Sequence, residues 1–345
     1  MGEVPGIAWE PVSQFFARQV PGGGVPLSFE LISGGRSNLT YHVSGGEQEW
    51  VLRRPPLGHV LPTAHDMARE YRVLSALAET EVPVPRTFAL CQDEAVNGAP
   101  FYVMEYTPGV ILHEGLPPGF ATTEDERRRI GSAMVEALVR LHAVDYEAVG
   151  LGDFGRPAGF IERQLRRWSQ QWERSKTREL PIIDELIAIL RARLPVSPAP
   201  TIVHGDYRLG NMALAPDTPD RILAIFDWEM ATVGDPLADL GYTLIYWGEE
   251  GDPPGALGDG RNQAVSAQPG FMTRAELVAE YAERSGRDVR AVPFYEALAF
   301  YKLAVISEGI QARFLKGKTV GEGFADAGNT ALRLIERGLE QARKL

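Results

Sequence analysis

The sequence predicts an α+β protein built from two units, a small β-rich unit followed by a larger helical unit. Short runs with strand character fill the first third of the chain, whereas apolar residues recur at helical spacing through most of the rest. Between these regions, Thr107-Pro108-Gly109 interrupts both patterns, because proline and glycine break regular structure. We therefore place an N-terminal lobe at residues 1–106 and a C-terminal lobe at residues 107–345.

The N-terminal lobe is predicted to hold a β-sheet and one helix. Met67, Tyr71 and Leu74 recur on one face of a helix expected between residues 66 and 78. Pro55-Pro56 ends the third strand, because proline cannot continue a hydrogen-bonded ladder. The expected strands are Leu27–Leu31, Thr40–Val43, Trp50–Arg53, Thr87–Cys91 and Phe101–Tyr106.

The C-terminal lobe is predicted to be mainly helical, with one β-hairpin at its centre. Thr273 and Glu276 have the spacing of a capping box, which marks the start of a helix. The stretch 249–270 is rich in Gly, Pro and Asp and is predicted to be a loop. The hairpin strands are expected at 212–214 and 222–226, and helices at 124–142, 159–175, 182–194 and in a group between 273 and 343.

Charge and composition exclude several classes of protein. The 345 residues include 35 Lys+Arg and 46 Asp+Glu, a net charge of −11, which disfavours nucleic acid as a partner because phosphate binding needs a basic surface. Hydrophobic residues make up 44% and charged residues 23%, as in ordinary globular proteins, so overall disorder is excluded.

Cysteine usage and the absence of long apolar runs predict a cytoplasmic protein. Cys91 is the single cysteine, so neither an internal disulfide nor a cysteine-based zinc site can form. No run approaches the roughly 18 apolar residues that span a membrane. The first residues contain an early acid, Glu3, and no apolar core, so a signal peptide is not expected.

The strongest chemical signal is the run His204-Gly205-Asp206-Tyr207-Arg208-Leu209-Gly210-Asn211, with Asp227 sixteen residues further on. This spacing matches the kinase catalytic loop H-x-D-x-x-x-x-N and its metal-binding aspartate. Phosphoryl transfer needs a positioned acceptor and neutralised phosphate charge. Asp206 is predicted to accept the proton of the acceptor hydroxyl, and Asn211 and Asp227 to offer oxygen ligands to Mg²⁺.

Two further acids follow this motif. Asp235 precedes Pro236, an arrangement typical of a helix N-terminus. Asp239 comes one turn later, where it either belongs to the helix alone or folds back to hold the backbone of the catalytic loop.

A second group of candidates lies in the N-terminal lobe. Ser33-Gly34-Gly35-Arg36-Ser37-Asn38 separates two strands, and its backbone amides, at Gly34, Gly35, Ser37 and Asn38, are candidates to cradle phosphates. It does not match the G-x-G-x-x-G of a Rossmann fold. Arg53 ends the next strand, with Glu70 on the following helix either as its ionic partner or as a solvated charge. If the strand presents its opposite face, Arg54 takes this role in place of Arg53.

Taken together, these residues resemble the aminoglycoside phosphotransferase and choline kinase-like family of the protein-kinase-like fold. The likeness runs from about residue 28 to residue 335 and rests on the H-G-D loop, on Phe226-Asp227-Trp228-Glu229 and on residues 234–240. A narrower similarity is to the kinase-like domains fused to some acyl-CoA dehydrogenases. Its motifs are Arg53-Arg54-Pro55-Pro56, residues 64–71 and residues 164–168.

The resemblance implies a bilobal fold that binds ATP or GTP with Mg²⁺ between its lobes. Backbone groups near Glu105 and Tyr106 would hold the purine, and Arg208 would meet the γ-phosphate. In one respect the chain departs from protein kinases, because Arg53 stands where they have lysine. Arginine keeps the charge but changes the reach and the geometry of phosphate binding.

Two classes of function are open at this point. The first is a kinase that phosphorylates a hydroxyl on a small molecule, either an aminoglycoside-like compound or a hydroxyacyl thioester. The alternative is a nucleotide-binding regulator without transfer activity, suggested by Arg53 and by the missing Phe-Gly after Asp227. A protein kinase is disfavoured, because no A-P-E segment follows Asp227. The expected partners are a nucleotide and a small acceptor, bound by a monomer or homodimer.

Residues around the acceptor can be named only as alternatives. Glu249, Glu250 and Asp252 form either an acidic lip for a cationic acceptor or a solvated loop. One helix face either receives anionic groups or is merely solvated, and it carries Arg163, Arg166, Arg167 and Trp168. Four residues of the late helical region are expected to wall the acceptor pocket: Trp247, Tyr301, Glu308 and Arg313.

Overall fold

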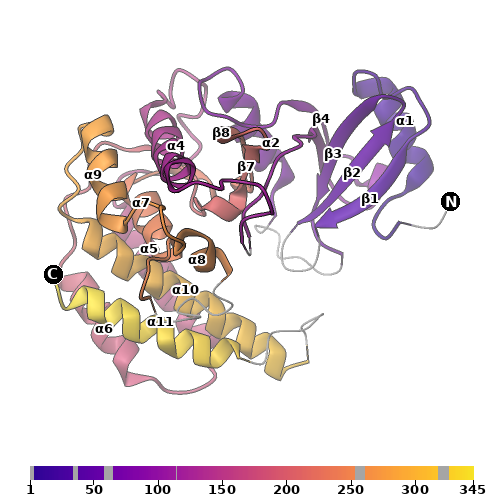
Figure 1. Ribbon diagram of the computed structural model, residues 1–345. Coiled ribbons are helices and arrows are strands. Elements are labelled where there is room, and N and C mark those ends of the chain that lie inside the picture. The colour runs from indigo at the N-terminus through magenta and orange to yellow at the C-terminus, as the bar shows by residue number, and fades with distance from the viewer. Residues whose placement is uncertain (1–3, 34–37, 58–64, 114, 253–260, 318–325) are drawn as a thin grey trace. The chain divides into compact units, whose positions relative to one another are not determined.

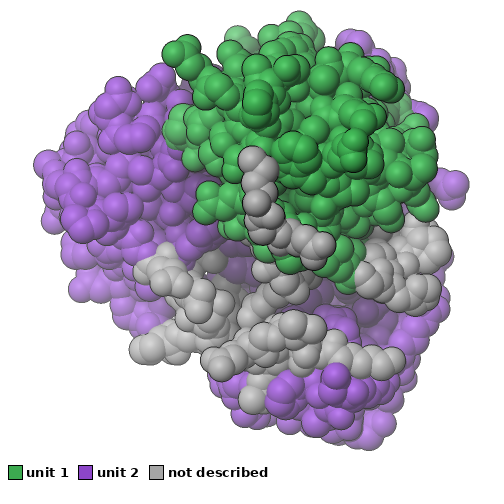
Figure 2. Space-filling model, turned by 90° about the vertical axis from the view of Figure 1, so that its right-hand side faces the viewer, with its two compact units in different colours: residues 1–108, 224–229 green, residues 109–223, 230–345 purple. Residues whose placement is uncertain are grey.

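The computed structural model describes residues 4–33, 38–57, 65–113, 115–252, 261–317 and 326–345 (Figure 1). Their contacts divide the chain into two compact units, coloured separately in Figure 2. Unit 1 comprises residues 1–108 together with 224–229, and unit 2 comprises residues 109–223 and 230–345. A short segment from the second half of the chain therefore belongs to the N-terminal unit.

Unit 1 is built around a five-stranded antiparallel sheet with the strand order β1-β2-β3-β5-β4. Tight pairing of β2 with β3 runs from Leu39 opposite Arg54 to Gly45 opposite Gln48. The elements are α1 (Trp9–Gln19), β1 (Ser28–Ser33), β2 (Leu39–Gly45), β3 (Gln48–Arg54), α2 (Met67–Leu77), β4 (Thr87–Cys91), α3 (Glu94–Asn97) and β5 (Phe101–Glu105).

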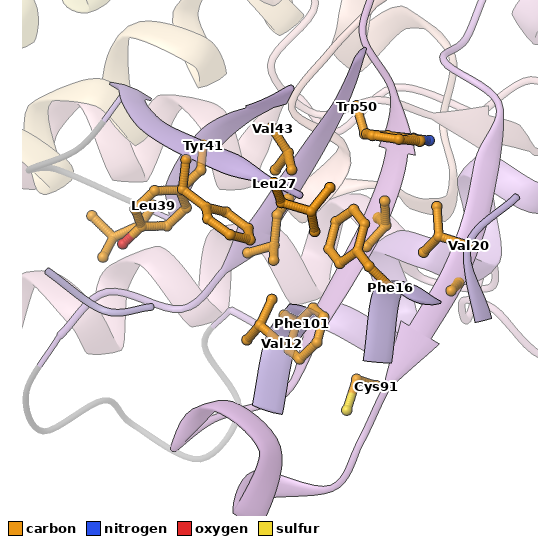
Figure 3. Packing of buried hydrophobic residues seen from close by; sticks show 14 residues of the cluster. Val12, Phe16, Val20, Leu27, Leu39, Tyr41, Val43, Trp50, Cys91 and Phe101 are labelled. Atoms are coloured by element: carbon orange, nitrogen blue, oxygen red, sulfur yellow. The ribbon is translucent and has the colours of Figure 1, made fainter. Parts of the chain in front are cut away.

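Helix α1 supplies part of the core of unit 1, and the sequence interpretation did not foresee it. Its Val12 and Phe16 are fully buried among strand residues (Figure 3). The Phe16 ring meets Phe29 and Trp50 edge to face, at centroid distances of 6.1 and 5.7 Å. Such contacts add to the hydrophobic free energy gained by burial. The helix therefore covers one face of the sheet and stabilises it.

Unit 2 is mainly helical and contains two small two-stranded sheets, β6-β9 and β7-β8. Its first elements are α4 (Glu124–Ala143), α5 (Phe160–Ser175), α6 (Pro181–Ala192), β6 (Thr201–Val203), η1 (Leu209–Asn211), β7 (Met212–Ala215) and β8 (Thr218–Ile225). The others are η2 (Trp228–Met230), β9 (Thr232–Gly234), α7 (Leu237–Tyr246), α8 (Arg261–Ser266), α9 (Arg274–Ser285), α10 (Val292–Leu315) and α11 (Ala327–Ala342). Strand β8 ends in residues that belong to unit 1, as does most of η2.

Helix α10 is the central helix of unit 2. It lies alongside α11 and also packs against α7, α5 and α6 (Figure 1). Apolar side chains are buried on all of its sides, which is typical of a helix surrounded by others. Gly241 of α7 permits close packing here, because a Cβ at this position would lie 2.6 Å from the Tyr295 backbone.

The predicted α+β class is confirmed, and most elements lie where the sequence placed them. The hairpin turn is tighter than expected, because β8 already begins at Thr218. Within the predicted loop 249–270, residues 261–266 form α8, and residues 253–260 lie outside the described part. None of the described helices combines the length and the hydropathy that crossing a membrane requires.

We predict that Phe16→Ala strongly destabilises unit 1. Removing a buried phenylalanine leaves a cavity and costs about 3–5 kcal/mol in the free energy of unfolding. Urea-induced unfolding measures this loss. The control is Gln14→Ala on the exposed side of the same helix, expected to change stability by less than about 0.5 kcal/mol. Equal effects of the two substitutions would show that α1 is not part of the core.

Candidate functional site

The catalytic loop predicted at residues 204–211 connects β6 to β7 in unit 2. Gly205 has a φ of +84°, a conformation that glycine adopts readily. Space also requires glycine here, since a Cβ would lie 2.8 Å from both Cβ and the carbonyl oxygen of Met230. The chain therefore turns sharply just before Asp206.

The Asp239 side chain stabilises this turn by accepting backbone hydrogen bonds. Its Oδ2 accepts a hydrogen bond from the His204 backbone N–H and its Oδ1 one from the Gly205 N–H, both at 2.7 Å. The side chain is completely buried, and Oδ2 lies 3.4 Å from His142 Nε2. Burial acts to raise the pKa of Asp239, but these hydrogen bonds and the nearby histidines outweigh it and hold the pKa below its usual value. Of the two roles weighed for Asp239, the structure shows the bracing one.

The Asp206 carboxylate is surrounded by hydrogen-bond donors. Asn211 Nδ2 lies 2.7 Å from Asp206 Oδ2 and 2.8 Å from the Asp206 backbone oxygen. Arg208 Nε lies 3.3 Å from Oδ1. The guanidinium of Arg208 stands over the Tyr246 ring, 5.3 Å from its centroid. These contacts give the carboxylate one defined orientation.

In unit 1, Arg53 is the centre of a buried ionic cluster. Its Nε lies 3.1 Å from Glu70 Oε2, and its Nη2 lies 2.5 Å from Asp227 Oδ1. Burial alone would lower the pKa of Arg53, but Glu70 and then Asp227 raise it above its usual value, so the guanidinium stays charged. Glu70 is only 2% exposed and is not a solvated charge.

Arg53, and not Arg54, is the residue that meets Glu70. Arg54 instead donates hydrogen bonds to the backbone oxygens of Gly6, Pro55 and Asn97. Neighbouring residues of a strand point to opposite faces, so only one of the two arginines can reach the helix that carries Glu70.

Asp227 reaches this cluster because the end of β8 is attached to unit 1. The Ile225 N–H donates to the Pro83 carbonyl at 2.8 Å. Asp227 itself has a φ of +66°, a left-handed conformation that is uncommon outside glycine but that aspartate tolerates better than most residues. The predicted site residues thus form two groups, Asp206, Arg208 and Asn211 in unit 2 and Arg53, Glu70 and Asp227 in unit 1.

The remaining nucleotide-binding candidates are only partly described. Gly34, Gly35 and Ser37 lie outside the described residues, whereas Asn38 is buried and its Nδ2 lies 3.2 Å from Glu229 Oε2. At the end of β5, the Glu105 N–H already donates to the Arg86 carbonyl at 2.8 Å. Tyr106 packs against the His42 ring, with the centroids 4.5 Å apart.

The candidates for the acceptor site have other partners. Arg274 binds Glu249 at 3.0 Å and also contacts Asp252, so two of the three acids are neutralised within unit 2. Arg166 and Arg167 are exposed, whereas Trp168 is buried. Three of the four expected wall residues are instead buried in the helical packing and hydrogen-bonded there: Trp247, Tyr301 and Glu308.

Two residues near Asp206 were missed by the sequence interpretation, Tyr242 on α7 and Lys302 on α10. Lys302 Nζ lies 2.6 Å from the Gly205 carbonyl oxygen and 4.2 Å from the centroid of the Tyr242 ring. No motif marks either residue, and Lys302 is 97 positions from Gly205 along the chain. Only the packing of α10 against α7 brings them to the loop.

Comparison with known proteins assigns the family. The sequence model of the phosphotransferase enzyme family APH matches residues 28–291, which is more than half of the chain. The chain belongs to this phosphotransferase family. The resemblance inferred from the H-G-D loop and the residues after Asp227 is thereby confirmed.

Individual relatives support the narrower similarity and the fold. The mouse acyl-CoA dehydrogenase family member 10 is 35% identical over 321 residues, 92% of this chain. Only 30% of that protein is matched, so the chain spans about a third of the length of this curated relative. The crystal structure of a protein from Ralstonia eutropha described as a putative aminoglycoside phosphotransferase has a TM-score of 0.83 and 36% identity, covering 97% of this chain and 98% of that one.

The fold is also similar to that of a phosphotransferase solved in complex with a nucleotide analogue. A thermostable mutant of aminoglycoside phosphotransferase APH(4)-Ia, bound to AMP-PNP and hygromycin B, has a TM-score of 0.62 and 14% identity, covering 96% of this chain and 99% of that one. At this identity the likeness concerns the fold alone. The phosphotransferase-family chain therefore has the kinase-like α+β fold.

We predict that Arg53→Met destabilises unit 1 by about 3–5 kcal/mol, because it leaves Glu70 buried without a cation. The double variant Arg53→Met/Glu70→Met should lose less than the sum of the two single changes. Chemical denaturation of all three variants measures the coupling. The surface pair Arg129–Asp125 is the control, and Arg129→Met should cost less than about 1 kcal/mol. Additive losses at positions 53 and 70 would contradict the ion pair.

Proposed function

We propose that this chain is an ATP-dependent phosphotransferase that phosphorylates a hydroxyl group of a small molecule. The acceptor oxygen attacks the γ-phosphorus of ATP, the bond from that phosphorus to the β,γ-bridging oxygen breaks, and ADP leaves. The acceptor proton passes to the carboxylate of Asp206. Membership of the phosphotransferase family supports the reaction type.

The observation that carries the proposal is the arrangement around Asp206. A general base must point in one direction and lie within hydrogen-bond reach of the proton that it accepts. Asp206 is oriented by Asn211 and Arg208, on a loop whose backbone is held by buried Asp239. A surface aspartate in an ordinary turn has no need of this support.

Arg208 is the proposed cation for the γ-phosphate. Its guanidinium is held between the Asp206 carboxylate and the Tyr246 ring. Burial acts to lower the pKa of Arg208, but Asp206 and the tyrosines outweigh it and raise the pKa. A charged donor in this position stabilises negative charge that develops on a transferred phosphoryl group.

The donor set in the two units fits Mg²⁺. Magnesium is usually held by one or two protein oxygen ligands together with substrate phosphates. The Asp227 carboxylate and the Asn211 amide oxygen are the proposed ligands, and the amide nitrogen of Asn211 is the atom that meets Asp206. Bound there, the ion would neutralise charge on the phosphates.

In unit 1, Arg53 and the residues Gly34, Gly35, Ser37 and Asn38 are proposed to bind phosphate, with Glu70 orienting Arg53.

For the acceptor, we favour a hydroxyacyl thioester over an aminoglycoside. Aminoglycosides are polycations, and the acids expected to attract them, Glu249 and Asp252, are already paired with Arg274. Close to Asp206 stand the cations Arg208 and Lys302. The mouse relative is named acyl-CoA dehydrogenase family member 10, and this name supports an acyl thioester as the acceptor.

We predict that Asp206→Asn lowers the rate of phosphoryl transfer by about 10²–10⁴-fold, the usual contribution of a general base. Nucleotide binding should persist, because the carboxylate acts on the acceptor. ADP release measures the rate, and a thermal-shift titration with ATP and Mg²⁺ measures binding. Asp217→Asn, the same change in the exposed β7–β8 turn, is the control and should leave both unchanged.

Two outcomes would overturn the proposal. Undiminished turnover in Asp206→Asn would remove Asp206 as the base. Nucleotide binding by the unaltered protein without transfer to any acceptor would favour the alternative function, a regulator that binds nucleotide.

We predict further that the protein phosphorylates hydroxyacyl-CoA thioesters and leaves aminoglycosides unmodified. The test is a panel of hydroxyacyl-CoA thioesters, free hydroxy acids and one aminoglycoside, each supplied with ATP or GTP. Mass spectrometry detects the added phosphoryl group, and Asp206→Asn provides the blank. Phosphorylation of the aminoglycoside alone would contradict the assignment of the acceptor.

A further inference from the structure

Both backbone polar groups of Gly205 are held by buried or partly buried charged side chains. Its N–H donates to Asp239 Oδ1 at 2.7 Å, and its carbonyl oxygen accepts from Lys302 Nζ at 2.6 Å. Asp239 lies on α7 and Lys302 on α10, two helices that pack against each other. A carboxylate and an ammonium group from two different helices therefore hydrogen-bond the backbone of a single residue of the catalytic loop.

These two contacts matter because Gly205 directly precedes Asp206, and glycine has more backbone freedom than other residues. Each residue has two soft dihedral angles, and glycine restricts them least. The Gly205 N–H belongs to the peptide plane before the residue, so the Asp239 contact restrains φ. The carbonyl belongs to the plane that leads into Asp206, so the Lys302 contact restrains ψ. The N–H in that second plane, that of Asp206, donates to His204 Nδ1 at 3.2 Å.

The surroundings of Lys302 are unusual for a lysine. It is partly buried, and its ammonium lies 4.2 Å from the centroid of the Tyr242 ring. Burial lowers the pKa of Lys302, Asp206 and Asp239 act against this, and Arg167 adds to it. Among the described residues, no carboxylate lies within ion-pairing distance of Lys302. The principal polar partner of its ammonium is the Gly205 carbonyl.

We propose that Lys302 is a positioning residue that sets the direction of the Asp206 carboxylate. Its ammonium fixes the plane of the Gly205–Asp206 peptide through a charge-assisted hydrogen bond, which is stronger than a neutral one. The role of the positioned carboxylate as a base rests on the proposed function, whereas the restraint on the loop does not.

The test is Lys302→Met, which keeps the length of the side chain and removes the charge. With the Asp206 carboxylate misdirected, kcat should fall by about 10- to 100-fold. The KM for ATP should change by less than about threefold, because the contact acts on the base and not on nucleotide binding. ADP release is measured with the best acceptor of the panel, or with water as acceptor. Lys316→Met, an exposed lysine at the end of the same helix, should match the unaltered protein.

Hydrogen–deuterium exchange provides a readout that does not depend on catalysis. The amides of residues 204–206 should exchange faster in Lys302→Met than in Lys316→Met, while thermal unfolding confirms that both variants are folded. Lys302→Arg keeps a cation on the carbonyl and should retain more of kcat than Lys302→Met. A folded Lys302→Met with unaltered kcat, or with unaltered exchange at 204–206, would overturn the proposal.

This design separates the two ideas. If the unaltered protein transfers phosphate to no acceptor, including water, then the proposed function fails. The positioning role of Lys302 is then decided by the exchange measurement alone. Faster exchange at 204–206 supports it and unchanged exchange refutes it.

Discussion

The arrangement around Asp206 depends on one buried carboxylate, that of Asp239. A sharp turn at Gly205 leaves backbone N–H groups pointing inward, and buried N–H groups without partners are costly. Asp239 accepts two of them, and His142 and the helix α7 hold the carboxylate itself. The turn is therefore built on a rigid helix, so the side chain that follows it has a defined direction.

A comparable principle governs unit 1, where Arg53 joins three elements of the chain. It lies on β3, Glu70 on α2, and Asp227 in a segment that follows β8. A buried cation of this kind is tolerated only when anions surround it, and each of these anions needs the arginine in turn. Loss of Arg53 would leave the buried Glu70 carboxylate without its cation.

Much of this could be predicted from the sequence because it is encoded locally. Periodicity predicts most strands and helices, and the spacing of Asp206, Asn211 and Asp227 indicates phosphoryl transfer. Helix α1 was missed, because its apolar stripe is short and precedes the family motifs. The loop expected across 249–270 contains α8, since glycine and proline obscured the short helix between them.

The sequence by itself determined the family, the α+β class and the identity of the loop that carries Asp206, because each depends on residues close together in the chain. Only the tertiary structure decided between Arg53 and Arg54, between a helical and a bracing role for Asp239, and between paired and solvated acids at Glu249 and Asp252. It alone brought Lys302 to Gly205. The physical reason is that burial and partner choice depend on which distant elements pack together, and no local pattern records this.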